Sequence, residues 1–403
     1  MPYEVNEAKR LVIEAGKKLI ENGLIARTWG NVSARISDTQ YCITPSGMPY
    51  ETLTPDKIVV VNIADNSYEG DIKPSTEKKL HSKLYALRPD VDFMIHTHQK
   101  AASAISTTGT CFAVPAEYQD VLGKEIPTAD YGLAGTKTLT ENVWKAARDY
   151  PDSKAILMAH HGTTCMGKDV DEAFAIAEAL ERTAEGIIAD VCSKAAGTEK
   201  TYDDLAEVFT DKIVPAENRS LTCSDLGNSV RKGTRFTLTM KDGSVYDCSV
   251  LSGTTPTGDA PLASLLHAAI YRKSDVRYIH HRADPETVAV SKMGQDETPY
   301  LDDFAQIAGK KVPCLHWDCS ERSAKMIASA IGSNSAIFLA GYGALCTGNT
   351  DDNAGAVELV LEKECKASMY AALTGDADTL KYIGRFLDRT VYVMKYSKIA
   401  DED

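Results

Sequence analysis

The sequence predicts two tandem α/β domains, each built as three layers, α/β/α, around a mixed and largely antiparallel sheet. Three observations support this fold class. Short apolar segments with strand character alternate with longer segments whose apolar residues recur at helical spacing. The chain has 403 residues, which is more than one hydrophobic core usually serves. Parts of the first half also recur in the second half, as expected of a duplicated domain.

The elements expected in the first half follow from these patterns. A helix should begin the chain at residues 5–22, where one apolar face is available for burial. Short strands are predicted at residues 31–37, 40–44, 58–62, 93–97 and 155–159. Further helices are predicted at residues 76–86, 101–107, 138–150 and 171–194. Because strands joined by hairpins are interspersed with helices, the sheet should be mixed, mostly antiparallel and covered on both faces.

Two pairs of segments reveal the internal repeat. Residues 153–172 and the segment from Ser335 onward share a frame of a strand, a glycine turn and a following helix. Residues 274–291 likewise resemble residues 89–106. The chain therefore looks like a tandem duplication.

The joint between the two copies is expected at residues 195–200, a small and polar stretch that follows the long helical segment. The two expected domains are residues 1–200 and 205–403. Each has about 200 residues, which is within the usual range for one domain.

Composition limits the classes of partner. The formal net charge is −13 and no Lys/Arg cluster is present, which argues against nucleic acid and anionic membranes as partners. No apolar stretch approaches the roughly 18 residues needed to span a bilayer, and the N-terminus is too polar for a signal peptide. The ten cysteines are scattered rather than placed in spaced pairs, which favours free thiols in a reducing cytoplasm.

Histidines mark a candidate metal site. His96 and His98 are two residues apart in a strand-like run, and residues i and i+2 of a strand point to one face. A third candidate comes later, in the pair His160 and His161 before Gly162. A catalytic zinc needs only three protein ligands and keeps one position for substrate. Three imidazoles on rigid elements would meet that need.

Three short polar turns mark a candidate anion site. Each combines a small residue with a hydroxyl or an amide: residues 30–31, 46–47 and 75–76. Glycine lets backbone N–H groups approach an anion closely. Ser75 and Thr76 also lie at the expected N-terminus of a helix, where unpaired N–H groups favour phosphate. Taken singly, each turn is better explained as an ordinary turn or a helix cap, and it is their joint occurrence that favours an anion site.

These motifs together resemble the class II aldolase/adducin family, whose enzymes include sugar-phosphate aldolases and epimerases. The residues concerned are TWGNVSAR at 28–35, ITPSG at 43–47, PSTE at 74–77 and the two histidine segments. They occur in the order of the family, and the resemblance covers residues 5–195. It implies the same three-layer fold for both copies.

The resemblance implies the roles of individual residues. His96, His98 and His161 would bind the metal, most simply zinc, with manganese or another divalent ion as the alternative. His161 is chosen over His160 because it directly precedes the glycine of the turn. His160 is expected on the opposite strand face, where it would pack or bond locally. The residues that would bind the substrate phosphate are Thr28, Gly30, Asn31, Ser46, Gly47, Ser75 and Thr76.

Glu77 and Tyr118 are the candidate catalytic side chains. An acid on the first turn of a helix is stabilised by the helix dipole whatever else it does. The resemblance implies more for Glu77, a base that takes the proton from the carbon next to a ketone held by the metal. Glutamate here favours cleavage of a carbon–carbon bond over epimerisation. Tyr118 would protonate the leaving aldehyde, or else be a half-buried core residue.

The second copy has lost these groups. Tyr342 stands where His161 stands in the first copy, and at most one of His280 and His281 can match the His96/His98 pair. Pro261 or Leu262 takes the place of Glu77. We interpret this copy as a degenerate, metal-free domain.

Single-domain members of the family are commonly fourfold tetramers with the site at a subunit boundary. Because this chain carries two copies of the domain, two chains should suffice to complete such a ring. The expected assembly is therefore a homodimer that forms a pseudo-tetramer of domains.

The function that this pattern favours is a metal-dependent aldolase. It would cleave a phosphorylated ketose into dihydroxyacetone phosphate and an aldehyde, through an enediolate stabilised by the metal. The same scaffold supports epimerases, dehydratases and decarboxylases of sugar phosphates, and fold alone cannot separate these reactions. A non-catalytic, adducin-like binding protein is the third alternative, which the complete ligand set of the first copy disfavours.

Overall fold

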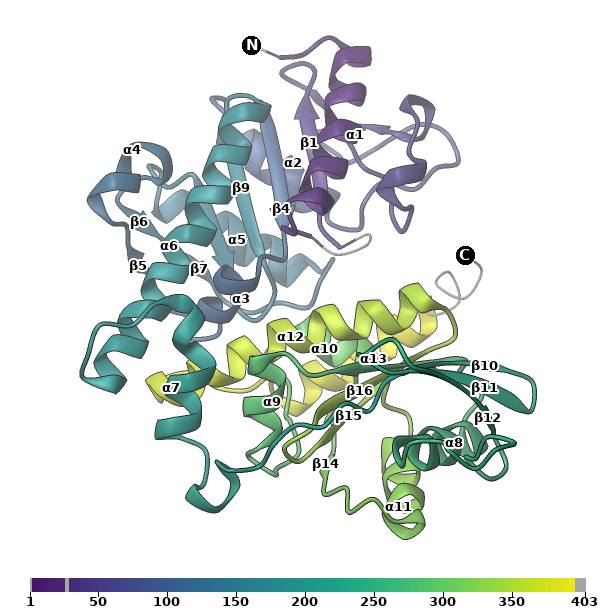
Figure 1. Cartoon of the computed structure of the whole chain (residues 1–403). Helices are drawn as coiled ribbons and strands as arrows, with labels where there is room; N and C mark the ends of the chain where they lie inside the picture. Colours follow the sequence, from purple (N-terminus) through teal and green to yellow (C-terminus); the bar gives the residue numbers. More distant parts are fainter. Residues whose placement is uncertain (1, 26–28, 396–403) are drawn as a thin grey trace. The chain divides into compact units, whose positions relative to one another are not determined.

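The computed structural model describes residues 2–25 and 29–395 of the chain, which form two compact units. The described residues up to 190 and residues 376–378 form the first unit, and residues 191–375 and 379–395 form the second. In Figure 1 the first unit runs from purple to teal and the second from teal-green to yellow. The predicted boundary between residues 200 and 205 lies a little further along the chain than this division.

The first unit is built on one seven-stranded sheet. Its strands are β1 (Asn31–Arg35), β2 (Gln40–Ile43), β3 (Val59–Asn62), β4 (Phe93–Thr97), β7 (Thr128–Ala129), β8 (Ala155–Met158) and β9 (Thr163–Gly167). They are arranged in the order β3-β2-β1-β4-β9-β8-β7. Neighbouring strands are antiparallel except for the parallel pair β7 and β8. A short separate pair consists of β5 (Phe112–Ala113) and β6 (Glu125–Ile126).

Helices cover both faces of this sheet. They are α1 (Val5–Glu21), α2 (Lys78–Leu87), α3 (Lys100–Ser106), α4 (Gln119–Leu122), α5 (Lys137–Asp149) and α6 (Val170–Ala196). Helices α2 and α5 pack together and share one core with the sheet, whereas α1 contacts β1 and β2 outside that core. Helix α6 crosses in front of β9 in Figure 1, and its Glu181 accepts N–H groups from the first turn of α3.

The core under α2 and α5 sets the direction of the strand that carries His96. Met94 of β4 packs in this core with Leu84 of α2 and Val143 of α5. Because alternate residues of a strand share a face, His96 must face the same helical layer as Met94. The end of β4 therefore presents an imidazole on the side where α2 begins.

The second unit repeats this architecture. Its strands are β10 (Asn228–Lys232), β11 (Arg235–Thr239), β12 (Val245–Ser249), β13 (Tyr278–Arg282), β14 (Cys314–Leu315), β15 (Ala336–Leu339) and β16 (Gly343–Gly348). Their order, β12-β11-β10-β13-β16-β15-β14, matches the first sheet strand for strand, and again the last pair is parallel. The remaining neighbours are antiparallel. Both sheets are thus mixed and largely antiparallel, and the predicted tandem α/β fold is confirmed.

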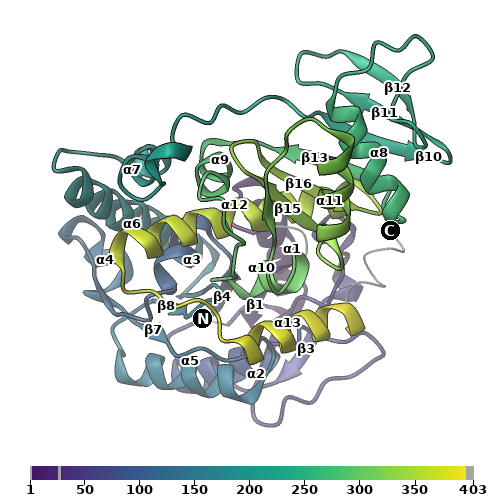
Figure 2. The ribbon, with the colours of Figure 1, turned by 90° about the horizontal axis from the view of Figure 1, so that it is seen from below.

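The helices of the second unit also lie on two faces. They are α7 (Leu205–Lys212), α8 (Ala263–Lys273), α9 (Pro285–Ser291), α10 (Asp302–Ile307), α11 (Glu321–Ile331), α12 (Asp351–Thr374) and α13 (Tyr382–Lys395). Helices α8 and α11 lie side by side and share one core with the sheet. Helices α9 and α12 contact β16 without joining that core (Figure 2). Pairs α2/α5 and α8/α11 therefore occupy corresponding places.

All the elements predicted for residues 5–194 are present, and their ends differ by at most two residues from those predicted. The prediction missed β9, because Thr163–Gly167 has no apolar alternation to separate it from the preceding turn. It also missed β5, β6 and β7, which have two residues each. None of the described helices combines the length and the apolar composition that crossing a bilayer requires.

Candidate metal centre

Three histidines converge at the end of β4 in the first unit. His96 belongs to β4, His98 follows it directly, and His161 lies in the turn between β8 and β9. Strand β9 pairs with β4, with Thr164 opposite His96, so the turn brings His161 beside the other two. One ligand atom from each histidine lies within 4.8 Å of the others. The structure thus brings together the three side chains that the sequence singles out, in an arrangement that could hold a metal ion.

Hydrogen bonding prepares His96 as a ligand. Its Nδ1–H donates to the carbonyl of Thr163 at 2.8 Å, which leaves the lone pair of Nε2 available. Burial lowers the pKa of His96 to about 3, so the ring is neutral at ordinary pH. A neutral imidazole whose second nitrogen is bonded to a carbonyl is the form that binds divalent metals.

The distance between the ligand nitrogens suits a metal ion with tetrahedral coordination. Nε2 of His96 and Nε2 of His98 are 3.1 Å apart. Two nitrogens that each bind zinc at about 2.0–2.1 Å with tetrahedral geometry would be about 3.3 Å apart. The rings of His96 and His161 are stacked, with centroids 5.1 Å apart. The donor set and its spacing therefore fit a divalent ion of the zinc type.

Gly162 allows the turn of His161 to approach β4. A Cβ atom at this position would lie 2.3 Å from the carbonyl oxygen of Thr97 and 3.2 Å from Cε1 of His96. Any larger residue would push the turn away from the strand and separate His161 from the other two rings. The glycine after His161 is therefore a geometric requirement of the cluster.

Glu77 lies against the histidine cluster. Its Oε2 is 3.2 Å from Nε2 of His96 and its Oε1 is 3.3 Å from Nε2 of His161. The residue is the N-cap of α2, just before the first turn on which the sequence placed it, and its side chain is buried. Nδ2 of Asn31 donates to Oε2 at 2.8 Å.

The environment of Glu77 keeps it ionised. Burial alone would raise the pKa of this carboxyl group, but His96, His161 and the amide of Asn31 together hold it well below its ordinary value. The carboxylate and the lone pair of His96 Nε2 face each other, which is unfavourable unless a cation lies among them. This local charge arrangement is a second reason to place a metal ion here.

Two of the three polar turns lie side by side. Pro45 and Pro74 form an isolated antiparallel bridge, Ser46 N–H donates to Lys73, and Ser75 N–H donates to Thr44. The turns at residues 46–47 and 75–76 are therefore neighbours. Gly47 has a φ of +72°, a backbone conformation that favours glycine.

The third polar turn precedes β1. Gly30 has a φ of +104°, and a Cβ there would lie 2.5 Å from the carbonyl oxygen of His96, so the chain can pass this close only with glycine. Asn31 begins β1 opposite His96 and reaches Glu77. Thr28 lies outside the described residues.

His160 does not take the position expected of it. It was predicted on the opposite strand face, but it lies in the turn after β8 with a φ of +64°. Its ring packs edge-to-face on Tyr131, with centroids 5.8 Å apart, so the expected local packing is present. Tyr118 ends a short helical turn before α4, and among the described residues no hydrogen bond or ring contact is seen between it and Glu77 or the three histidines.

The strand register identifies the counterparts of the metal ligands in the second unit. Ser33 pairs with Met94 in the first unit, and Ser229 pairs with Ile279 in the second. His281 therefore corresponds to His96, and Ala283 to His98. The register of β16 against β13 places Tyr342 at the position of His161, as the sequence predicts.

The position of Glu77 in the second unit is corrected by the structure. His267 of α8 has the same buried contacts as His81 of α2, and this alignment places Ala263 at the position of Glu77. The sequence comparison had expected Pro261 or Leu262, because the gap before α8 could not be placed without the helix register. In either alignment the carboxylate is missing.

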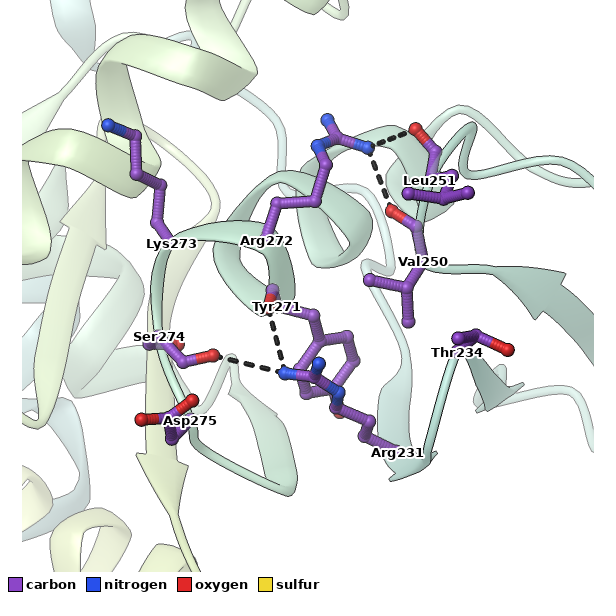
Figure 3. Close-up of a pocket in the computed structure, with 9 residues that line it drawn as sticks. All are labelled: Arg231, Thr234, Val250, Leu251, Tyr271, Arg272, Lys273, Ser274 and Asp275. Atoms are coloured by element: carbon purple, nitrogen blue, oxygen red, sulfur yellow. Dashed lines mark hydrogen bonds between the residues drawn. The ribbon is translucent and has the colours of Figure 1, made fainter.

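A hollow of about 370 Å³ lies beside α8 in the second unit (Figure 3). Arg272 there donates to the carbonyls of Val250 and Leu251, at 2.9 and 2.7 Å. Arg231 donates to the carbonyls of Tyr271 and Ser274. Both guanidinium groups in this hollow thus bind the backbone, and they hold the end of α8 to the neighbouring loops.

One residue near the centre, His81, and two contacts of Asn31 were not foreseen from the sequence. Asn31 was expected to contact phosphate, but its contact with Glu77 was not anticipated. Neither was the contact of Asn31 with His81, a buried histidine of α2. A polar residue in an otherwise apolar helix face is the one signal that could have drawn attention to His81.

Known proteins resemble this chain in sequence. The profile of the class II aldolase and adducin N-terminal domain matches two segments, residues 10–188 and 234–369. The 5-deoxy-D-ribulose 1-phosphate aldolase of Bacillus thuringiensis serovar kurstaki is 30% identical over 175 residues, which cover 43% of this chain and 81% of that protein. The L-fuculose phosphate aldolase of Escherichia coli K12 is 33% identical over 185 residues, which cover 45% and 83%.

The solved structure of a fuculose-phosphate aldolase also resembles this chain. An L-fuculose 1-phosphate aldolase aligns with a TM-score of 0.44 and 30% identity, over 53% of this chain and 93% of that chain.

Proposed function

Because this chain belongs to the class II aldolase and adducin family, we propose that its first unit is a divalent-metal-dependent aldolase of phosphorylated ketoses. It would cleave its substrate into dihydroxyacetone phosphate and an aldehyde. One observation carries this proposal: the buried carboxyl group of Glu77 lies against three convergent histidines. Metal-dependent cleavage of a carbon–carbon bond next to a ketone requires a base beside the metal site.

His96, His98 and His161 would hold the ion, with zinc as the first candidate. When bound, the ion would act as a Lewis acid on the carbonyl and neighbouring hydroxyl oxygens of the substrate. The carbonyl of Thr163 keeps the proton of His96 on Nδ1, so that Nε2 is ready to bind without a change of tautomer.

Glu77 would transfer the proton. In the direction of bond formation, its carboxylate takes the proton from the carbon next to the carbonyl of dihydroxyacetone phosphate. In cleavage it returns this proton to the same carbon. The N–H of Asn31 holds Oε2, which limits rotation of the carboxylate and keeps it directed at the substrate.

The three polar turns would hold the substrate phosphate. They offer backbone N–H groups and hydroxyls, and their members in the described residues are Gly30, Asn31, Ser46, Gly47, Ser75 and Thr76. The second amide hydrogen of Asn31 remains available to the substrate, because the first is donated to Glu77. Tyr118 is retained as the group proposed to exchange a proton with the aldehyde oxygen: it would donate the proton in bond formation and accept it from the substrate hydroxyl in cleavage.

The first experiment separates this reaction from others on the same scaffold. In deuterium oxide, the chain loaded with zinc should exchange hydrogen for deuterium on the carbon next to the carbonyl of dihydroxyacetone phosphate, as followed by NMR. A panel of pentulose, hexulose and deoxyketose 1-phosphates should then release dihydroxyacetone phosphate from at least one member. Epimerised, dehydrated or decarboxylated products without this release would instead support one of the alternative reactions.

We also propose that the chain assembles as a homodimer, with domains at residues 1–200 and 205–403. The support is the duplicated fold, since a pair of chains supplies four aldolase-like domains. Light scattering should give about twice the chain mass of 43.7 kDa. A monomer at micromolar concentration would contradict the proposed assembly without affecting the proposed chemistry.

A further inference from the structure

A buried polar trio lies behind the metal centre of the first unit. Oγ of Ser33 in β1 is 2.6 Å from Nδ1 of His81 and 2.9 Å from the hydroxyl of Tyr85, both in α2. All three side chains are at most 1% exposed. Arg35, two residues along β1, donates to the carbonyl of Tyr85 at 2.8 Å and so fixes the same helix.

The second unit has the same trio. Oγ of Ser229 is 2.7 Å from Nδ1 of His267 and 2.7 Å from the hydroxyl of Tyr271. Arg231 donates to the carbonyl of Tyr271 at 2.8 Å, and Figure 3 shows it beside the Tyr271 ring. Phe236 stacks on His267 as Tyr41 stacks on His81 in the first unit. The trio is therefore a feature of the fold that does not depend on a metal centre.

The two units differ in what the histidine contacts next. In the first unit, Nε2 of His81 is 2.5 Å from Oδ1 of Asn31, whose Nδ2 donates to Glu77. In the second unit the strand register places Gly227 at the position of Asn31. Within the described part of the chain, Nε2 of His267 has no side-chain hydrogen-bond partner, and the backbone of Leu226 lies near the ring. The histidine of the trio therefore continues through an asparagine to a carboxylate only in the first unit, which contains Glu77.

The charge of Glu77 fixes the direction of every bond in this chain. A carboxylate only accepts, so the amide NH₂ of Asn31 must face it and the amide oxygen must face His81. His81 then carries its proton on Nε2 and accepts from the hydroxyl of Ser33 at Nδ1. Ser33 in turn accepts from Tyr85. Each of these four contacts then joins one donor to one acceptor, and His81 is neutral in this arrangement.

We propose that His81 is a positioning residue for the reaction, which acts through Asn31 to hold the carboxylate of Glu77 in its reactive orientation. This inference rests on the proposed role of Glu77 as the base. Without the N–H of His81, the amide of Asn31 is held only through its contact with Glu77, so the donor to the carboxylate is no longer fixed in place. A small misplacement of a catalytic group lowers turnover even when the group itself is intact.

Two substitutions of His81 separate positioning from packing. Asparagine places its amide where Nδ1 lies, so His81→Asn can keep the contact with Ser33 but loses the contact with Asn31. Glutamine reaches the place of Nε2, so His81→Gln can keep the donor to Asn31. His267→Asn is the matched control, because it makes the same change in a trio that has no Asn31 or Glu77.

The readout is deuterium exchange into dihydroxyacetone phosphate by the full-length zinc-loaded chain, with metal content and melting temperature measured in parallel. His81→Asn is expected to lower kcat by about ten- to a hundredfold with little change in KM or zinc content. His81→Gln should recover most of this loss, and His267→Asn should keep the kcat of the unaltered chain. His81→Asn and His267→Asn should show similar melting temperatures.

Several outcomes would overturn the proposal. Unaltered kcat in His81→Asn would show that the contact with Asn31 has no part in catalysis. An equal loss in His81→Gln would assign the effect to packing. If His81→Asn does not fold, Asn31→Ser removes the same link and leaves the trio intact, and an unaltered kcat there would decide against the proposal. Absence of exchange by the unaltered chain would overturn the proposed function together with it.

Discussion

Replacing Glu77 with glutamine is expected to lower turnover at least about a hundredfold while the bound metal is retained. Glutamine has nearly the same shape, but its amide has no basic oxygen to take a proton. The three histidines that would hold the ion are untouched by this change. Steady-state turnover of the responsive ketose phosphate and deuterium exchange into dihydroxyacetone phosphate measure the loss, and elemental analysis measures the metal.

Glu69→Gln is the matched control for this variant, because Glu69 is exposed on the same unit and the change of charge is identical. It should keep full activity. If Glu77→Gln also keeps full turnover with metal in place, Glu77 is not the base and the proposed mechanism is wrong. If Glu77→Gln loses both turnover and metal, the carboxylate serves mainly to hold the ion.

The fold was predictable where local pattern decides it. Helices such as α1 and α5 carry one apolar face, and strand β4 is a continuous apolar run that ends in its histidines. Strand β9 was not predictable in this way, because its pairing with β4 depends on the turn at Gly162 rather than on alternating side chains. Two-residue strands such as β7 carry too little sequence to give any periodicity.

The same distinction applies to the candidate site: contacts between residues close in sequence were predictable, and contacts between distant residues were not. His96 and His98 are two residues apart, one in β4 and the other directly after it, so the local backbone suffices to bring them together. The contact between Asn31 and Glu77 joins residues 46 positions apart, and that between Asn31 and His81 joins residues 50 apart. Such contacts depend on the register of β1 against β4 and on the start of α2. Residue types alone carry no signal for them, so the role of His81 emerged only from the structure.

The second unit shows how few side chains separate a scaffold from a site. It keeps the strand order, the buried trio and even the close approach of a glycine, since a Cβ at Gly343 would lie 2.3 Å from the carbonyl oxygen of Arg282. Gly162 has the same contact with Thr97 in the first unit. What differs is the set of groups at the end of this scaffold, where Tyr342 and Ala283 provide no imidazole. Fold is thus retained independently of the chemistry.

Removing two ligands should abolish both the metal and the activity. In His96→Ala/His98→Ala one imidazole remains, and a single neutral ligand cannot hold a divalent ion tightly. We expect about one divalent ion per 403-residue chain in the unaltered protein purified without chelator, and close to none in the variant. Turnover should fall to the background rate, because Glu77 would have no Lewis acid beside it. Elemental analysis and the dihydroxyacetone phosphate assay provide the two measurements.

Two controls assign the metal to these residues. His160→Asn changes the histidine next to His161, and asparagine tolerates the left-handed backbone found there, so metal and activity should persist. His281→Ala removes the counterpart of His96 in the second unit and should also leave the metal content unchanged. Retention of the ion by His96→Ala/His98→Ala would contradict the site. Two ions per chain, one of them lost in His281→Ala, would instead place a second centre in the second unit, where Tyr342 and Ala283 argue against one.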